Sequence, residues 1–135
     1  GVTRGEMAAF LVRALRLPPT PATDSFVDDD GHFFEGDIET LRAYGVTTGC
    51  TTTRYCPDSG VTRGEMAAFL VRGFDLVSAA GDSFVDDDGH FFESSIEALV
   101  RSGVTSGCNT RSFCPNRAVT RAEMAAFLIR ALAAG

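Results

Sequence analysis

The sequence lacks concentrated positive charge and long apolar segments. Its 135 residues include 12 basic and 18 acidic residues, for a formal net charge of -6, so no strongly basic face is available to bind nucleic acid. No apolar run approaches the roughly 18 residues of a membrane-spanning helix, and no signal peptide is visible. We therefore expect no nucleic-acid partner and no membrane span.

Catalytic motifs are absent as well. The sequence shows no Ser-His-Asp or Cys-His arrangement and no glycine-rich loop of the kind that holds phosphate. Its two histidines, His32 and His90, stand beside aromatic residues, where packing or a hydrogen bond at a helix start is expected rather than metal binding. We therefore predict a protein that is not an enzyme and that requires no cofactor.

The chain consists of internal repeats. The string VTRGEMAAFL occupies residues 2–11 and 61–70, and residues 119–128 repeat it with Ala122 in place of glycine. A second string, FVDDDGHFFE, occupies residues 26–35 and 84–93, so the repeating unit is about 58 residues long. Units of this size pack on one another because a single unit cannot bury its apolar face. We expect the function to lie in the surfaces that the packed units present.

Each VTRGEMAAFL string has the pattern of a helix start. Thr3 is placed as the N-cap: its hydroxyl can accept from the backbone N–H of Glu6, while the Glu6 carboxylate accepts from the N–H of Thr3. The same capping box is expected at Thr62 with Glu65 and at Thr120 with Glu123. Apolar residues follow at helical spacing, so three such helices can bury their faces together.

A second type of helix is expected after each acidic string. Phe34, Ile38 and Leu41 share one helical face, and the helix should end at Gly45-Val46 in a Schellman motif. The equivalent helix should end at Gly103-Val104, and residues 18–23 and 78–81 should form turns. We therefore predict an all-α fold. Residues 1–135 should form a single domain with one helix of an incomplete repeat (1–17) and two helix-loop-helix repeats (24–76 and 82–133).

The four cysteines occur at equivalent positions in the two repeats. We predict two local disulfides, Cys50–Cys56 and Cys108–Cys114, with free thiols or a metal site as the alternative. Zinc would need four ligands, whereas each repeat offers two cysteines and one distant histidine. Closing a loop of about seven residues removes roughly 2 to 2.5 kcal/mol of unfolded-state freedom. Disulfides imply an oxidising location outside the cytoplasm.

These motifs resemble, in order and spacing, the S-layer homology repeat. The residues that carry the resemblance are Phe26-Val27-Asp28, Gly31-His32-Phe33, Tyr55-Cys56-Pro57, residues 61–65, the matching residues 84–129, and the Thr-Arg-Ala-Glu form at residues 120–123. The resemblance implies a pseudo-threefold bundle of three capping-box helices with the other two helices outside. It also implies a module that binds wall-linked polysaccharide, often pyruvylated, in grooves between repeats.

The candidate ligand-binding residues are three arginines and two phenylalanines. Arg4, Arg63 and Arg121 each occupy the first turn of a helix, where the helix dipole disfavours positive charge. An anionic sugar docked there would gain from the guanidinium and from the positive helix end; the alternative is an ion pair within the protein. Phe33 and Phe91 stand where the family usually has tryptophan, which this chain lacks, so the surface for sugar stacking is smaller.

The acidic strings are candidate calcium sites. The expected oxygen ligands are Asp28, Asp30 and Glu35, and in the second copy Asp86, Asp88 and Glu93. The spacing matches an EF-hand poorly, and the alternative is that these residues cap the following helix and complement its dipole. The acidic strings therefore give a hypothesis of calcium binding.

Two functions remain open from the sequence. In the first, the chain is a non-catalytic extracellular anchor that tethers an exported protein to the cell envelope by binding anionic wall polysaccharide. In the second, it is a structural assembly module of a surface layer, filament or oligomer, stabilised by calcium. The half repeat at the start favours the first function, whereas the Asp strings and the missing tryptophan favour the second. Both functions imply a location at the cell surface or in the cell wall.

Overall fold

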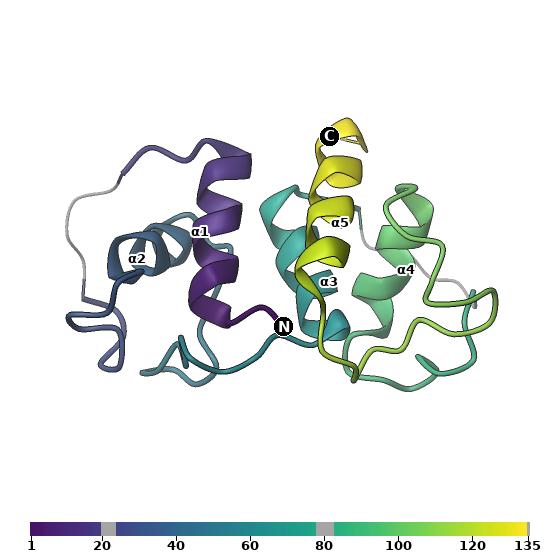
Figure 1. Cartoon of the computed structure of the whole chain (residues 1–135), viewed down its shortest axis with the longest axis horizontal. Coiled ribbons are helices and arrows are strands. Elements are labelled where there is room, and N and C mark those ends of the chain that lie inside the picture. Colours follow the sequence, from purple (N-terminus) through teal and green to yellow (C-terminus); the bar gives the residue numbers. More distant parts are fainter. Residues whose placement is uncertain (20–23, 78–82, 135) are drawn as a thin grey trace. The chain divides into compact units, whose positions relative to one another are not determined.

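The computed structural model describes residues 1–19, 24–77 and 83–134 (Figure 1). These residues form the helices α1 (Arg4–Leu15), α2 (Glu35–Ala43), α3 (Arg63–Gly73), α4 (Glu93–Arg101) and α5 (Arg121–Ala134). In these three ranges there is no strand, and the extended pairs are isolated bridges, Thr3 with Gly60 and Thr62 with Ala118. The all-α prediction is confirmed. Of the turns predicted at residues 18–23 and 78–81, residues 20–23 and 78–81 lie outside the described residues.

The chain forms two compact units. Residues 2–61 form one unit with α1 and α2, and residues 62–135, together with Gly1, form the other with α3, α4 and α5. Helix α1 packs on α2 in the first unit, and α3 packs on α4 in the second. Each packed pair therefore joins a capping-box helix to the helix that follows it, whereas the repeats expected from the sequence begin at the acidic string. The single domain and the pseudo-threefold bundle stay predictions.

The predicted capping boxes begin α1, α3 and α5. In α1, the Thr3 hydroxyl accepts from the Glu6 N–H at 3.1 Å, and the Glu6 carboxylate accepts from the Thr3 N–H at 2.9 Å. The corresponding pairs, with both bonds present, are Thr62 with Glu65 and Thr120 with Glu123. Each cap of this kind typically contributes about 1 kcal/mol.

The Schellman stops are also confirmed. After α2, Gly45 has a φ of +76°, its N–H donates to the Arg42 carbonyl at 3.1 Å, and the Val46 N–H donates to the Leu41 carbonyl at 2.9 Å. Gly103 and Val104 make the same two bonds after α4. A positive φ suits glycine because it has no β-carbon, so this residue fixes the direction in which the chain leaves the helix.

The first turns of α1 and α3 pass very close to neighbouring loops that come later in the sequence. The N–H of Gly64 donates to the Pro115 carbonyl at 2.8 Å. A β-carbon on Gly64 would lie 3.0 Å from the Phe92 ring and 3.2 Å from the Pro115 carbonyl oxygen. Gly5 is equally confined, whereas Ala122 in the third copy is exposed. The glycine is therefore needed where a neighbouring loop is held against the start of the helix.

Candidate functional site

Two disulfides stabilise the loops that lead into α3 and α5. The predicted pairing is confirmed: Cys50 bonds to Cys56 and Cys108 to Cys114, with Cα atoms 6.1 Å apart in each pair. The residue just before the second cysteine of each loop, Tyr55 or Phe113, is fully buried. Each loop thereby presents a main-chain carbonyl and an aromatic ring to the arginine at the start of a helix.

Arg63 lies in this position in the second unit and is 2% exposed. Its Nε donates to the Phe113 carbonyl at 2.8 Å, and its Nη1 donates to Oε2 of Glu123 on α5 at 2.7 Å. The guanidinium carbon lies 4.6 Å from the Phe113 ring centroid and 5.2 Å from that of Phe127. Nη2 is buried and has no hydrogen-bond partner. The arginine is therefore firmly placed, but the N–H groups of its Nη2 have no partner.

Glu123 compensates part of the charge of Arg63. Its Oε2 also accepts from Nη2 of Arg117 at 2.7 Å, and its Oε1 accepts from the Thr120 N–H at 3.0 Å. Burial opposes ionisation of Glu123, but this N–H and the two guanidinium groups outweigh it and hold the pKa of Glu123 below its ordinary value. Burial also lowers the pKa of Arg63, and Glu123 opposes that shift. Because arginine stays protonated in proteins, the cluster of two cations and one carboxylate carries net positive charge.

A groove of about 320 Å³ opens beside Arg63. Its lining residues come from α3, α5 and the loop after α4: Arg63, Thr105, Gly107, Ala122, Glu123, Ala126, Phe127 and Arg130. The volume lies near the lower end of the range typical of small-ligand sites, about 300 to 1,000 Å³. The groove thus offers two arginines, a hydroxyl and an aromatic ring to a ligand.

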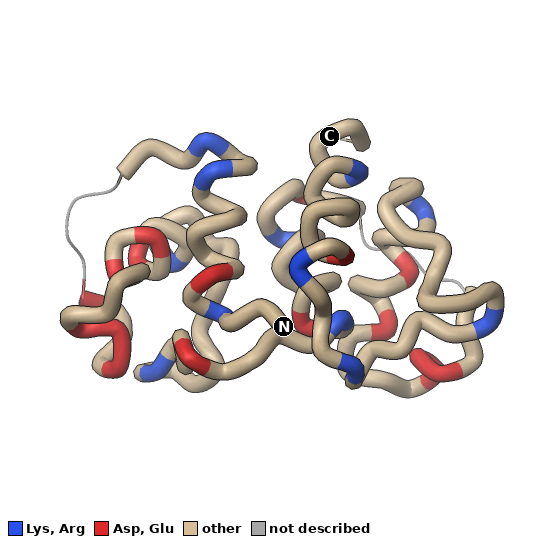
Figure 2. The backbone as a smooth tube through the Cα atoms, in the orientation of Figure 1, with Lys and Arg blue, Asp and Glu red and all other residues tan. Residues whose placement is uncertain are grey.

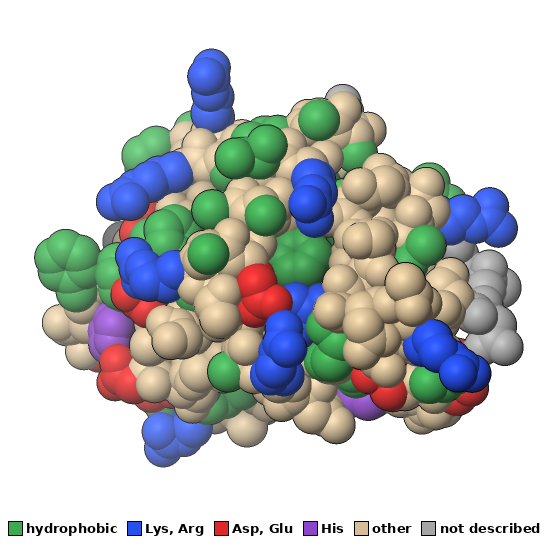
Figure 3. Space-filling model, turned by 45° about the vertical axis from the view of Figure 1, so that its right-hand side comes forward, with side chains coloured by type: hydrophobic (Ala, Val, Ile, Leu, Met, Phe, Trp, Pro, Cys, Tyr) green, Lys and Arg blue, Asp and Glu red, His purple; other side chains and the backbone are tan. Residues whose placement is uncertain are grey.

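The other two candidate arginines have different surroundings. Arg4 is buried in the first unit, with Nε donating to the Tyr55 carbonyl at 2.7 Å and its guanidinium carbon 4.6 Å from the Tyr55 ring centroid. The Tyr55 hydroxyl donates to the Arg4 carbonyl at 2.8 Å. Arg121 is exposed at the start of α5. In the space-filling view, a hollow with a hydrophobic floor lies beside acidic and basic side chains (Figure 3).

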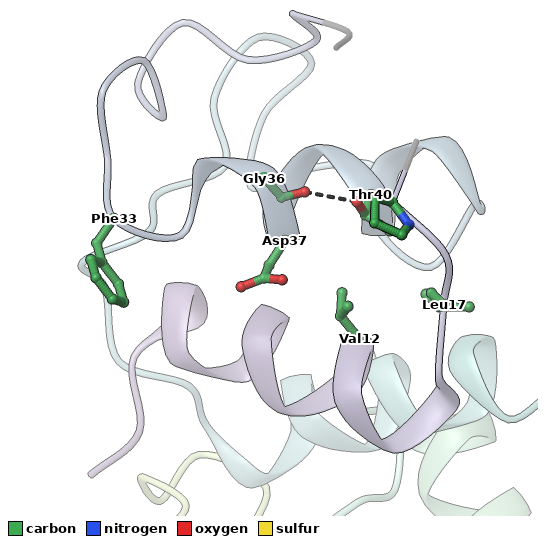
Figure 4. Close-up of a pocket in the computed structure, with 7 residues that line it drawn as sticks. Val12, Leu17, Phe33, Gly36, Asp37 and Thr40 are labelled. Atoms are coloured by element: carbon green, nitrogen blue, oxygen red, sulfur yellow. Dashed lines mark hydrogen bonds between the residues drawn. The ribbon is translucent and has the colours of Figure 1, made fainter. Parts of the chain in front are cut away.

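Phe33 and Phe91 are highly exposed, at 89% and 88%. Each packs edge-on against the next phenylalanine, with ring centroids 4.9 Å apart for Phe33 and Phe34. Phe33 borders a second cavity of about 320 Å³ between α1 and α2, into which Asp37 points from α2 (Figure 4). Neither exposed phenylalanine lines the Arg63 groove. The structure therefore does not join the candidate stacking residues to the candidate anion site.

His32 and His90 have the role expected of them at a helix start. The His32 Nδ1 accepts from the Phe34 N–H at 3.1 Å, and the His90 Nδ1 accepts from the Phe92 N–H at the same distance. The other ring nitrogen of His32 lies 3.0 Å from an Asp58 carboxylate oxygen. These contacts orient the loop before each helix, so the two histidines have a structural role.

The carboxylates of the acidic strings have two different kinds of contact. Both oxygens of Asp28 accept backbone N–H groups, from Tyr55 and Cys56, each at 2.8 Å. Burial opposes ionisation of Asp28, but these N–H donors outweigh it and lower its pKa. Asp86 makes the equivalent bonds in the second unit. Asp28 and Asp86, expected among calcium ligands, thus connect the acidic loop to the disulfide loop.

Asp29 and Asp87, which no sequence pattern indicated as ligands, belong to the acidic clusters. The clusters whose ligand atoms lie within 4.8 Å of one another are Asp24, Asp29, Asp30 and Glu35 in the first unit, and Asp87, Asp88 and Glu93 in the second. Figure 2 shows the first set on the loop before α2 and at the start of that helix. Burial and the neighbouring Glu39 raise the pKa of Asp29 to about 8, and burial and Glu97 raise that of Asp87 to about 7.

Comparisons with known proteins identify the family of the repeats. The family model described as the S-layer homology domain matches residues 25–67 and 83–125. An endoglucanase from Bacillus sp. (strain KSM-635) is 32% identical over 94 residues, which cover 70% of this chain and 10% of that enzyme. The S-layer protein EA1 of Bacillus anthracis is 30% identical over 133 residues, which cover 96% of this chain and 15% of that protein.

A third relative, the exoglucanase XynX of Acetivibrio thermocellus, is 28% identical over 79% of this chain and 10% of its own length. The chain thus spans only 10% to 15% of these relatives. Among the described helices, none combines the length and apolarity needed to cross a membrane. Two matched repeats, with their capping boxes and glycine stops in place, lead to one assignment: the chain belongs to the S-layer homology domain family.

Proposed function

We propose that this chain anchors an exported protein to the cell wall by binding an anionic wall polysaccharide, and that the Arg63 groove is the principal contact. Membership of the S-layer homology family supports anchoring and a cell-surface or cell-wall location. The two disulfides agree with an oxidising environment outside the cytoplasm. The names of two relatives, an endoglucanase and an exoglucanase, support a module attached to larger proteins.

The observation that carries the proposal is the unused Nη2 donor of Arg63. A buried polar group without a partner costs about 1 to 3 kcal/mol, and more when it is charged. Arg63 lines the groove but its Nη2 is buried, so a ligand oxygen would recover this cost where the groove lining moves aside and lets it reach this nitrogen. A carboxylate is the suitable acceptor, since guanidinium–carboxylate hydrogen bonds are about twice as strong as neutral ones.

The other groove residues suit a sugar that carries such a carboxylate. The Phe127 ring gives an apolar surface on which a sugar ring can pack, and Thr105 gives a hydroxyl that both donates and accepts. Arg130 adds a second cation to the lining. Glu123 is already engaged by two arginines, so it repels an anionic ligand less than a free carboxylate would.

Binding to purified cell-wall sacculi tests the proposal directly. We expect the protein to sediment with intact sacculi and to remain in solution with sacculi from which the polysaccharide has been removed. Equal binding to both preparations, or to neither, would contradict the proposal.

A second function, assembly of a surface layer, is favoured by the S-layer proteins among the relatives, of which EA1 matches 96% of this chain. In that case the repeat surfaces contact other subunits. Sedimentation velocity across a concentration series distinguishes the two functions, because an assembly module associates with itself without polysaccharide.

A further inference from the structure

We propose that each acidic loop binds one calcium ion, with the buried carboxylate of Asp29 in the first unit and that of Asp87 in the second as central ligands. The site is separate from the polysaccharide groove and uses none of its lining residues. The presence or absence of calcium binding therefore does not bear on the proposed anchoring function.

The first support is the burial of two carboxylates without donors. Asp29 and Asp87 are both 0% exposed, and neither oxygen of either side chain has a hydrogen-bond partner. A carboxylate is an acceptor only, and its removal from water without a donor or a cation is among the costliest arrangements in a protein. The same arrangement occurs in both copies of the repeat, so it belongs to the architecture of the loop.

The second support is the position of the other carboxylates. Ligand atoms of Asp24, Asp30 and Glu35 lie with that of Asp29 within 4.8 Å of one another. Two oxygens bound to the same calcium ion, each at about 2.4 Å, cannot lie farther apart than about 4.8 Å. The four side chains can therefore reach one ion, although Glu35 also accepts the Gly31 N–H at 3.1 Å.

The donor set selects the kind of cation. All the side chains in both clusters offer carboxylate oxygens, and none offers sulfur or imidazole nitrogen. Hard cations prefer such oxygens, whereas zinc and copper sites normally include cysteine or histidine. Calcium accepts six to eight ligands in irregular geometry, which suits an irregular loop better than the strict octahedron of magnesium.

The competing explanation for the buried Asp29 is a proton that it shares with the neighbouring carboxyl group of Glu39. Glu39 lies next to Asp29 and accepts the N–H groups of Ser25 and Phe26 at 2.9 and 3.3 Å. In that account Asp29 is a neutral acid that donates to Glu39, and no cation is needed. An asparagine in its place would then donate the same bond, with or without calcium.

Calorimetric titration of the chelator-treated protein with calcium chloride separates the two accounts. We expect two ions per chain for the unmodified protein, one for Asp29→Asn or Asp87→Asn, and none for the double variant. Asp58→Asn is the matched control, because it removes one exposed carboxylate from the same unit and copies Asn116 of the second repeat. This control should still bind two ions.

The outcome that overturns the proposal is absence of calcium binding at millimolar concentration, or unchanged stoichiometry in the double variant. Circular dichroism should accompany each titration to show that the variants fold. If the buried substitutions prevent folding, Asp30→Asn and Asp88→Asn test the same sites through exposed ligands. Undiminished calcium affinity in both of these variants would likewise contradict the proposal.

Discussion

Replacing Arg63 by alanine should weaken polysaccharide binding at least tenfold. The variant removes the Nη2 donor and one of the two arginines of the groove. A hydrogen bond to a charged group contributes about 1.5 to 3 kcal/mol, and each 1.4 kcal/mol changes the dissociation constant tenfold. The expected loss is therefore about tenfold to a hundredfold.

The same substitution should also lower stability, because the Arg63 side chain is buried. It removes the bond to the Phe113 carbonyl and leaves Glu123 with Arg117 and the Thr120 N–H as its partners. This burial makes a measured melting curve of the variant necessary. Binding should therefore be compared well below the melting temperatures of both proteins.

The assay is depletion of soluble protein by increasing amounts of purified sacculi. Arg101→Ala is the matched control, since Arg101 lies exposed in the last turn of α4 and does not line the groove. Arg130→Gln tests the groove through an exposed lining residue if Arg63→Ala fails to fold. Undiminished binding by folded Arg63→Ala, or an equal loss in Arg101→Ala, would refute the reasoning.

Three further predictions concern stability. Phe69 is 4% exposed, so Phe69→Ala should cost about 3 to 5 kcal/mol in denaturant unfolding; a loss below about 1 kcal/mol would contradict its place in the core. Gly64→Ala should destabilise the protein by about 1 to 3 kcal/mol because the new β-carbon lies 3.0 Å from the Phe92 ring. Gly36→Ala has open space around it and should stabilise the protein by up to about 1 kcal/mol. Similar melting temperatures of these two variants would disprove the crowding at Gly64. Since the pKa of Glu123 in the folded protein is lowered from 4.5, its ionised form should stabilise the fold above pH 4.5. This contribution should disappear as the pH falls through the folded pKa. A Glu123→Gln variant with the same acid denaturation profile as the unmodified protein would argue against this role of Glu123.

The helix starts and stops could be predicted because they depend on residues close in sequence. The Thr3 and Glu6 side chains meet each other's backbone three positions away, and Gly45 forms its turn with Arg42. Such contacts follow from residue type and spacing once a helix exists. The short disulfides are local for the same reason, with a sequence separation of 6.

The candidate sites depend on contacts that the sequence does not reveal. Three consecutive aspartates have the same chemistry, and only the fold decides that Asp28 turns toward the N–H of Tyr55, 27 residues away, while Asp29 is buried. Arg63 likewise meets the Phe113 carbonyl across 50 residues and Glu123 across 60. The repetition indicated that these residues have a role, but their contact partners could be identified only from the tertiary structure.

The repeated motif produces unequal sites because its partners differ between copies. Arg4 and Arg63 occupy equivalent positions, yet Arg4 meets a tyrosine whose hydroxyl returns to the arginine carbonyl, whereas Arg63 meets Phe113, which has no hydroxyl. Helix α5, the third copy of the motif, then brings Glu123 and Phe127 against Arg63. Since five of the eight lining residues lie on α5, this third copy completes the groove, and the position that is glycine in the other two copies contributes Ala122 to its wall. The third helix therefore completes a groove that begins in the second copy, so the copies of the motif need not form equivalent grooves.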